Sequence, residues 1–302
     1  MIRRRNRVSA RGAAALSIVL AATLAGCLDA NTPTPGPTGT AVPEATPQVT
    51  TYDLGATVWY EGLIVHVDRA VATLDPRGGP VAVTIRLENP NDDVGELDGP
   101  IQLVVGTTRI APNEDSAVPL VPPNGSMPVT LTYDLQAISS VDLASIEIGA
   151  APQHVARVPL TPRAGEPAFF EPRHLKPTGS ATSGDLKITI RSGLLRWDLP
   201  DWSQELDSDL AALTLTYDVT YIGTFAGGFA FTADSVALRL PNGTVVNPRR
   251  DGHSQSVELI GAQKTKKGLF SRFEIPSGAT GTFALLVKNG STTKTIKFTI
   301  GG

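Results

Sequence analysis

Hydrophobic and polar residues alternate with a period of two over most of the chain from residue 51 onward. The segment VAVTIRLE (81–88) places two valines, an isoleucine and a leucine on one side, with Ala, Thr, Arg and Glu on the other. The segments LTLTYDVTY (213–221) and TIKFTI (295–300) repeat this pattern. Such alternation is typical of strands that bury one side and expose the other, so the sequence predicts antiparallel β-strands.

Turn signals separate the strand-like segments. Asn-Gly pairs occur at 124–125, 242–243 and 289–290, and the last two lie between strand-like runs, as a two-residue hairpin requires. Helical spacing is nearly absent. The best candidate is SQELDSDLAAL (203–213), whose leucines predict a turn or two of helix before a strand begins. We therefore expect an all-β fold.

The β-pattern is too long for one domain. About 250 residues follow it, whereas one immunoglobulin-like sandwich needs about 100. A segment rich in Pro, Gly and Ser interrupts the pattern near its middle. The sequence thus predicts two tandem immunoglobulin-like β-sandwich domains, at 51–162 and 184–302, joined by a linker at 163–183.

Charge differs between the two halves. Residues 51–162 contain 14 acidic and five basic side chains with no lysine, whereas residues 163–302 contain 13 acidic and 16 basic ones. The resulting net charges of −9 and +3 predict surfaces with different tasks, or attraction between the halves. Without the first 26 residues the chain keeps 21 basic and 29 acidic side chains. Because this excess of negative charge repels a polyanion, we expect no nucleic-acid partner.

The N-terminus follows the pattern of a secretory signal. Five arginines between positions 3 and 11 precede an uncharged stretch that includes AAALSIVLAATLA (13–25), and LAGC (24–27) then supplies the only cysteine. This arrangement resembles the lipobox of bacterial lipoproteins. The resemblance implies cleavage of a signal peptide, 1–26, by signal peptidase II and a diacylglycerol on Cys27. The alternatives are a retained membrane anchor, or an ordinary cleaved signal followed by an unrelated thiol.

A lipid on Cys27 would place the protein on the extracytoplasmic side of the cell membrane. The following residues, up to position 50, include five prolines and six threonines among small residues. Because this composition cannot bury a core, residues 27–50 are predicted to form a disordered, extended tether with a reach of about 70 Å. Beyond the covalent acyl lipid, we expect no cofactor.

The first half of the chain resembles a second family. YDLGATVWYEGL (52–63) is followed by an alternating strand and by an acidic turn with Asn89, Asp92 and Asp93. These features are similar to the telokin-like, immunoglobulin-fold extracellular domains of many bacterial lipoproteins, whose function is unknown. The family's pattern matches Leu54, Gly55, Val58, Tyr60, Gly62 and Leu63. The resemblance covers roughly 51–150 and implies an exposed binding or scaffold module without catalytic residues.

Two acidic segments are candidate sites. ENPNDDVGELDG (88–99) is dense in oxygen ligands, which suits calcium, and its candidate ligands are Asn89, Asn91, Asp93 and Glu96. The EF-hand pattern fails because Val94 stands where glycine is needed, so a solvated loop is the simpler interpretation. RWDLPDWSQELDSD (196–209) places carboxylates beside tryptophans, which suits glycan binding or hydrolysis. Its candidate binding residues are Asp201, Trp202 and Glu205.

These patterns predict a non-enzymatic binding, adhesion or scaffold module of the cell envelope, held at the membrane by its lipid. No nucleophile, base and orienting group occur together in one motif. The alternative is an extracytoplasmic hydrolase that uses the acidic residues near Trp202. The partner, an envelope or extracellular molecule, is not identified by the sequence. A basic turn, KTKK (264–267), is predicted to solubilise a strand edge or to face anionic wall or lipid groups.

Overall fold

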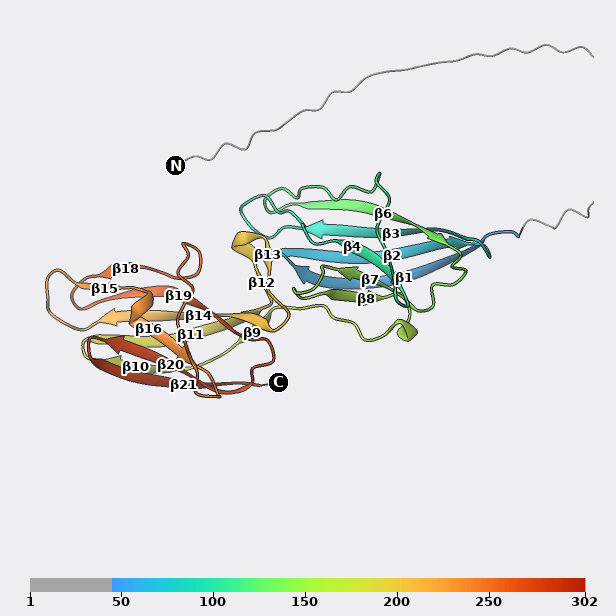
Figure 1. Ribbon diagram of the computed structural model, residues 1–302. Coiled ribbons are helices and arrows are strands. Elements are labelled where there is room, and N and C mark those ends of the chain that lie inside the picture. Colours follow the sequence, from blue (N-terminus) through green and yellow to red (C-terminus); the bar gives the residue numbers. More distant parts are fainter. Residues whose placement is uncertain (1–44, 302) are drawn as a thin grey trace, which may run out of the picture. The chain divides into compact units, whose positions relative to one another are not determined.

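The computed structural model describes residues 45–301, which form antiparallel β-sheets and three short 3-10 helices (Figure 1). The predicted all-β class is therefore confirmed. No helix among the described residues is long and apolar enough to span a bilayer. The predicted signal peptide, Cys27 and the first part of the tether lie outside the described residues.

Two four-stranded sheets share the first hydrophobic core. One has the order β1-β2-β3-β6, with β1 (Gln48–Tyr60), β2 (Leu63–Leu74), β3 (Gly78–Glu88) and β6 (Ser126–Gln136). The other has the order β5-β4-β7-β8, with β4 (Ile101–Val105), β5 (Thr108–Ile110), β7 (Ala144–Ile148) and β8 (Ala156–Pro159). Their inward side chains form one cluster, and we call this assembly the first sandwich.

The second sandwich is built around a separate core. Its larger sheet contains β10 (Gly179–Ser183), β11 (Leu186–Arg196), β14 (Leu210–Tyr221) and β19 (Lys264–Pro276), and β9 (Arg173–Leu175) also pairs with β11. The facing sheet contains β17 (Val245–Val246), β16 (Val236–Arg239), β20 (Gly281–Asn289) and β21 (Thr292–Ile300). Two small two-stranded sheets accompany it, β15 (Phe229–Phe231) with β18 (Glu258–Ile260), and β12 (Asp198–Leu199) with β13 (Gln204–Glu205). The 3-10 helices are η1 (Pro162–Ala164), η2 (Pro200–Trp202) and η3 (Ala233–Ser235).

The alternating segments bury the predicted side chains. In β3 the four inward residues Val81, Val83, Ile85 and Leu87 are fully buried, and in β14 and β21 the predicted inward residues are buried as well. The Asn-Gly pairs at 242–243 and 289–290 connect β16 to β17 and β20 to β21. The period of two was therefore sufficient to identify these strands and their buried sides.

Several predicted boundaries differ in the structure. β1 begins at Gln48, inside the expected tether, and β9 and β10 lie inside the expected linker 163–183. The helical turn expected over 203–213 is wrong, because this segment forms β13 and the start of β14. The described residues, 45–301, also lie within one compact unit. The division into two independently folding domains at 51–162 and 184–302 thus stays a prediction.

The motif in β1 and β2 has a physical explanation. Val58, Tyr60 and Leu63 are fully buried, while Gly55 adopts a φ of +54° at an irregularity in the β1–β2 register. Gly62 has a φ of +82° in the tight turn between the strands. A Cβ there would lie 2.8 Å from the Cα of Pro200. The motif therefore combines core positions with one strand irregularity and one turn that both favour glycine.

Candidate functional site

Between β11 and β14 the chain forms a short arm, residues 197–209. Its hairpin pairs Asp198 with Glu205, and η2 closes the turn with Ser203 in the left-handed conformation. Leu199 and Leu206 are buried in a small cluster with Ala212 of β14. The leucines at helical spacing do not form one helical face. Leu206 and Leu210 pack in this small cluster, whereas Leu213 packs in the core of the second sandwich.

Two buried carboxylates of the arm bind the turn between β1 and β2. Oδ2 of Asp198 accepts hydrogen bonds from the backbone N–H of Gly62 (2.7 Å) and from Nη2 of Arg196 (2.8 Å). Oε2 of Glu205 accepts from the backbone N–H of Glu61 (3.2 Å). These bonds join segments more than 130 residues apart, and they give both carboxylates a structural role.

The same turn binds the acidic loop, residues 89–98. Oε2 of Glu61 accepts hydrogen bonds from the backbone N–H groups of Asp98 (2.8 Å) and Gly99 (3.2 Å). The carbonyl oxygen of Gly62 accepts from Nδ2 of Asn91 (3.1 Å). The Glu61–Gly62 turn is therefore held between the arm and the acidic loop.

Burial dominates the electrostatics of this junction. Burial and the neighbouring charge of Asp198 raise the pKa of Glu205 to about 9. Burial also raises the pKa of Glu61. Oε1 of Glu205 and the hydroxyl of Tyr60 are both buried without a hydrogen-bond partner among the described residues. The raised pKa favours the protonated, neutral form of Glu205 at neutral pH, whereas Arg196 forms an ion pair with Asp198.

The acidic loop and the arm line one polar hollow of about 310 Å³. Its lining consists of residues 90–95 together with Pro200, Asp201 and Ser203. The candidates Asn91, Asp93 and Asp201 thus meet at this surface, although the sequence placed them in separate segments. Glu96 is exposed outside this lining, and Glu205 is buried within the arm.

Asn89 organises the acidic loop from beneath. Its buried amide donates hydrogen bonds to the carbonyl oxygens of Asp93 (2.7 Å) and Val121 (3.2 Å), and its Oδ1 accepts from the N–H of Asn91 (3.0 Å). The candidate calcium ligand therefore fixes the loop conformation with its side chain. Within residues 45–301, no three His, Cys, Asp or Glu side chains gather where they would hold a metal ion.

Asp201 and Trp202 also contact the second sandwich. Oδ2 of Asp201 accepts a hydrogen bond from Nη2 of Arg272 in β19 (2.8 Å). The ring of Trp202, 46% exposed, lies edge-on to His253 with centroids 5.0 Å apart. The sequence pattern pointed to Trp202 but not to Arg272 or Glu61. The roles of Arg272 and Glu61 depend on partners that are distant in sequence, so the local sequence gives no signal for them.

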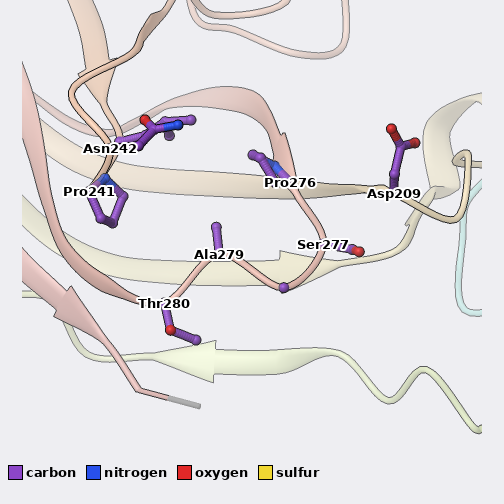
Figure 2. Close-up of a pocket in the computed structure, with 9 residues that line it drawn as sticks. Asp209, Pro241, Asn242, Pro276, Ser277, Ala279 and Thr280 are labelled. Atoms are coloured by element: carbon purple, nitrogen blue, oxygen red, sulfur yellow. The ribbon is translucent and has the colours of Figure 1, made fainter.

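A larger hollow of about 460 Å³ lies in the second sandwich (Figure 2). Leu240, Pro241, Asn242 and residues 276–280 line it, with Asp209 as the single charged member. The backbone N–H of Ser277 donates to the carbonyl oxygen of Asp209 (2.8 Å). The hydroxyl of Ser277 donates to the carbonyl oxygen of Ser208 (3.1 Å). These bonds close the loop around the hollow. The polar candidates identified from the sequence converge instead at the arm and the acidic loop.

Comparisons with known proteins give few matches. No family model matches the chain, and no curated protein matches it. Among solved structures, the chain is similar to one titled "The crystal structure of the conserved domain protein from Bacillus anthracis". The two are 10% identical, the match covers 83% of this chain and 90% of that one, and the TM-score is 0.26. At this similarity the match bears on neither the detailed fold nor the function.

Proposed function

We propose that this protein is a lipid-anchored, extracytoplasmic binding module of the cell envelope that does not transform its partner. The observation that carries the proposal is LAGC at 24–27, placed directly behind a basic and an apolar segment. The Pro/Thr-rich segment follows, and the first strand begins at Gln48. This order, anchor then tether then sandwich, is what display of a folded module at a membrane requires.

The polar hollow between the acidic loop and the arm is the binding surface that we propose. Asp92 and Asp93 give it negative charge, whereas the charge of Asp201 is paired with Arg272 and the amide of Asn91 is bonded to Gly62. The hydrogen bonds of Asn89 and Asp198 hold the two sides of the hollow in place. Loops held by a rigid sandwich commonly bind partners, so a partner with complementary positive or hydrogen-bonding groups fits this surface.

The hydrolase alternative has one observation in its favour. Asp198 and Glu205 are paired carboxylates, and the pKa of Glu205 is raised to about 9, which resembles the division between an acid and its charged partner in glycosidases. Both carboxylates, however, are buried and bind backbone N–H groups of the Glu61–Gly62 turn. The binding module is therefore better supported.

Charge reversal at the hollow tests the binding proposal. In the native cell, the Asp92→Lys/Asp93→Lys variant is expected to cross-link to its envelope partner at least fivefold less than wild type, because the attraction across the contact is reversed. Its free energy of unfolding should change by less than about 1 kcal/mol, since both side chains are exposed.

The matched control is Glu114→Lys/Asp115→Lys, an exposed acidic pair outside the hollow. Equal cross-linking by the two variants would exclude the hollow as the binding surface. Hydrolysis of glycan, ester or peptide substrates by the purified protein, abolished in Asp201→Asn or Glu205→Gln, would favour the enzyme instead.

A further inference from the structure

Exposed apolar side chains gather at one end of the second sandwich. Ile222 is 46% exposed, Phe225 69%, Val257 63% and Leu259 65%. All four lie in the loop after β14 or in the segment that includes β18, and β18 pairs with β15, which follows that loop. Large apolar side chains concentrated on one surface indicate an interaction site.

Strand pairing places the ends of several strands together at this end. Leu186, at the start of β11, pairs with Tyr221 at the end of β14, which pairs with Lys264 at the start of β19. In the facing sheet, Nδ2 of Asn289 donates to the carbonyl of Ser183 (3.1 Å), which joins the β20–β21 turn to the end of β10. Figure 1 shows β10, β15 and β18 at this end. We call it the tip, comprising residues 184–187, 222–228, 257–267 and 288–294.

The tip is also strongly basic. Of the eight lysines in the chain, six lie in these segments: Lys187, Lys264, Lys266, Lys267, Lys288 and Lys294. The same segments contain two carboxylates, Asp185 and Glu258, which leaves a net charge of +4. Glu258 forms an ion pair with Lys266 (3.3 Å), and Lys267 lies near the carboxylate of Asp218, whereas Lys187, Lys264 and Lys294 are exposed.

We propose that the tip is a peripheral membrane-binding surface that rests on an anionic lipid bilayer. The side chains of Phe225, Ile222 and Leu259 enter the headgroup region, while the lysines contact lipid phosphates. The combination favours a bilayer over a soluble polyanion, because a polyanion offers nothing to exposed apolar side chains. The surface is independent of Cys27 and of the acidic hollow, and it would set the orientation of the protein on the membrane.

Vesicle binding by the unlipidated chain from Leu28 to Gly302 tests this proposal. This chain keeps the whole compact unit, Ala45–Gly302. It is expected to sediment with vesicles that contain 30% phosphatidylglycerol, and at least tenfold more weakly with pure phosphatidylcholine. The Lys264→Glu/Lys267→Glu variant should bind at least tenfold more weakly, since each lysine near an anionic surface contributes about fivefold. Phe225→Ser/Leu259→Ser should also lose at least tenfold.

Each variant has a matched control. Lys176→Glu/Lys297→Glu makes the same charge change outside the tip, and Leu120→Ser/Leu143→Ser removes two leucines that are exposed elsewhere. Both controls are expected to bind within twofold of wild type. Absence of binding to anionic vesicles, or equal losses in variants and controls, would overturn the proposal. Unchanged binding by the Phe225→Ser/Leu259→Ser variant would indicate a purely electrostatic polyanion surface and would overturn it as well.

A second measurement does not depend on loss of binding. Because Cys27 is the only cysteine, the chain from Leu28 has none, and Phe225→Cys creates a single labelling site. A polarity-sensitive fluorophore at this position is expected to shift to shorter wavelength when phosphatidylglycerol vesicles are added. The same fluorophore on Leu120→Cys should not shift. An unshifted label at position 225 would contradict insertion of the tip.

Discussion

The free energy of unfolding of this protein is expected to decrease between pH 5 and pH 9. In the Glu205→Gln variant this decrease is expected to be much smaller. Glu205 is 1% exposed, and burial raises its pKa from 4.5 to about 9, with a further contribution from the charge of Asp198. Burial also raises the pKa of the neighbouring Glu61. Arg196, paired with Asp198, is the cation at this junction. The hydroxyl of Tyr60, whose pKa burial raises, is the neutral neighbour.

The direction follows from proton linkage. Below pH 4.5 the Glu205 carboxyl is protonated in the folded and the unfolded chain, so its contribution to stability is fully present. Between pH 4.5 and 9 the unfolded chain has released this proton while the folded chain keeps it, so stability decreases as pH rises. Above pH 9 the contribution is lost. We expect a decrease on the order of 3 kcal/mol over this range, less than the full shift because the neighbouring carboxylates titrate together.

Urea unfolding of wild type and Glu205→Gln at several pH values measures this effect. The neutral amide keeps the shape and the acceptor for the Glu61 N–H, but it cannot ionise. The variant is therefore expected to gain stability relative to wild type as pH rises. Glu96→Gln, an exposed glutamate in the acidic loop, is the control and should follow the wild-type curve. Parallel curves for wild type and Glu205→Gln would show that Glu205 ionises normally.

Cys27→Ala is expected to abolish maturation of the protein. In the proposed pathway the thiol receives the lipid before signal peptidase II cleaves, so removal of the thiol blocks both steps. The variant should accumulate at precursor size with residues 1–26 attached, whereas wild type should be converted to the mature form. Immunoblotting of cell fractions measures the two sizes.

Two substitutions complete this experiment. Asp29→Ala, two residues after the cysteine, leaves the lipobox intact and should be processed normally. Normal processing of Cys27→Ala would instead indicate an ordinary signal peptide and an unrelated thiol, one of the alternatives that the sequence leaves open.

The sequence predicted strands best where alternating apolar side chains are buried. β3 and β14 were identified because each second residue enters a core. β10, with the sequence GSATS, was assigned to a linker because it is an edge strand of small polar residues and buries only Ser183. Edge strands pair through their backbone, and backbone pairing leaves little trace in composition.

The candidate site was predicted in its parts but not in its arrangement. The acidic loop and the arm both stood out by their carboxylates, yet their common neighbour is the Glu61–Gly62 turn, far from the arm in sequence. Glu205 was selected as a surface ligand and is a buried acid instead. The burial of Glu205 involves a distant partner, the backbone N–H of Glu61, and local sequence does not specify such a contact.

The most direct test of the central claim is the mass of the N-terminal peptide of the protein purified from its native membranes. We predict that the mature chain begins at Cys27 and that this residue carries a thioether-linked diacylglycerol. A mature chain that begins elsewhere, or that contains Cys27 as a free thiol, would contradict the proposal that this sandwich protein is displayed from a lipid anchor.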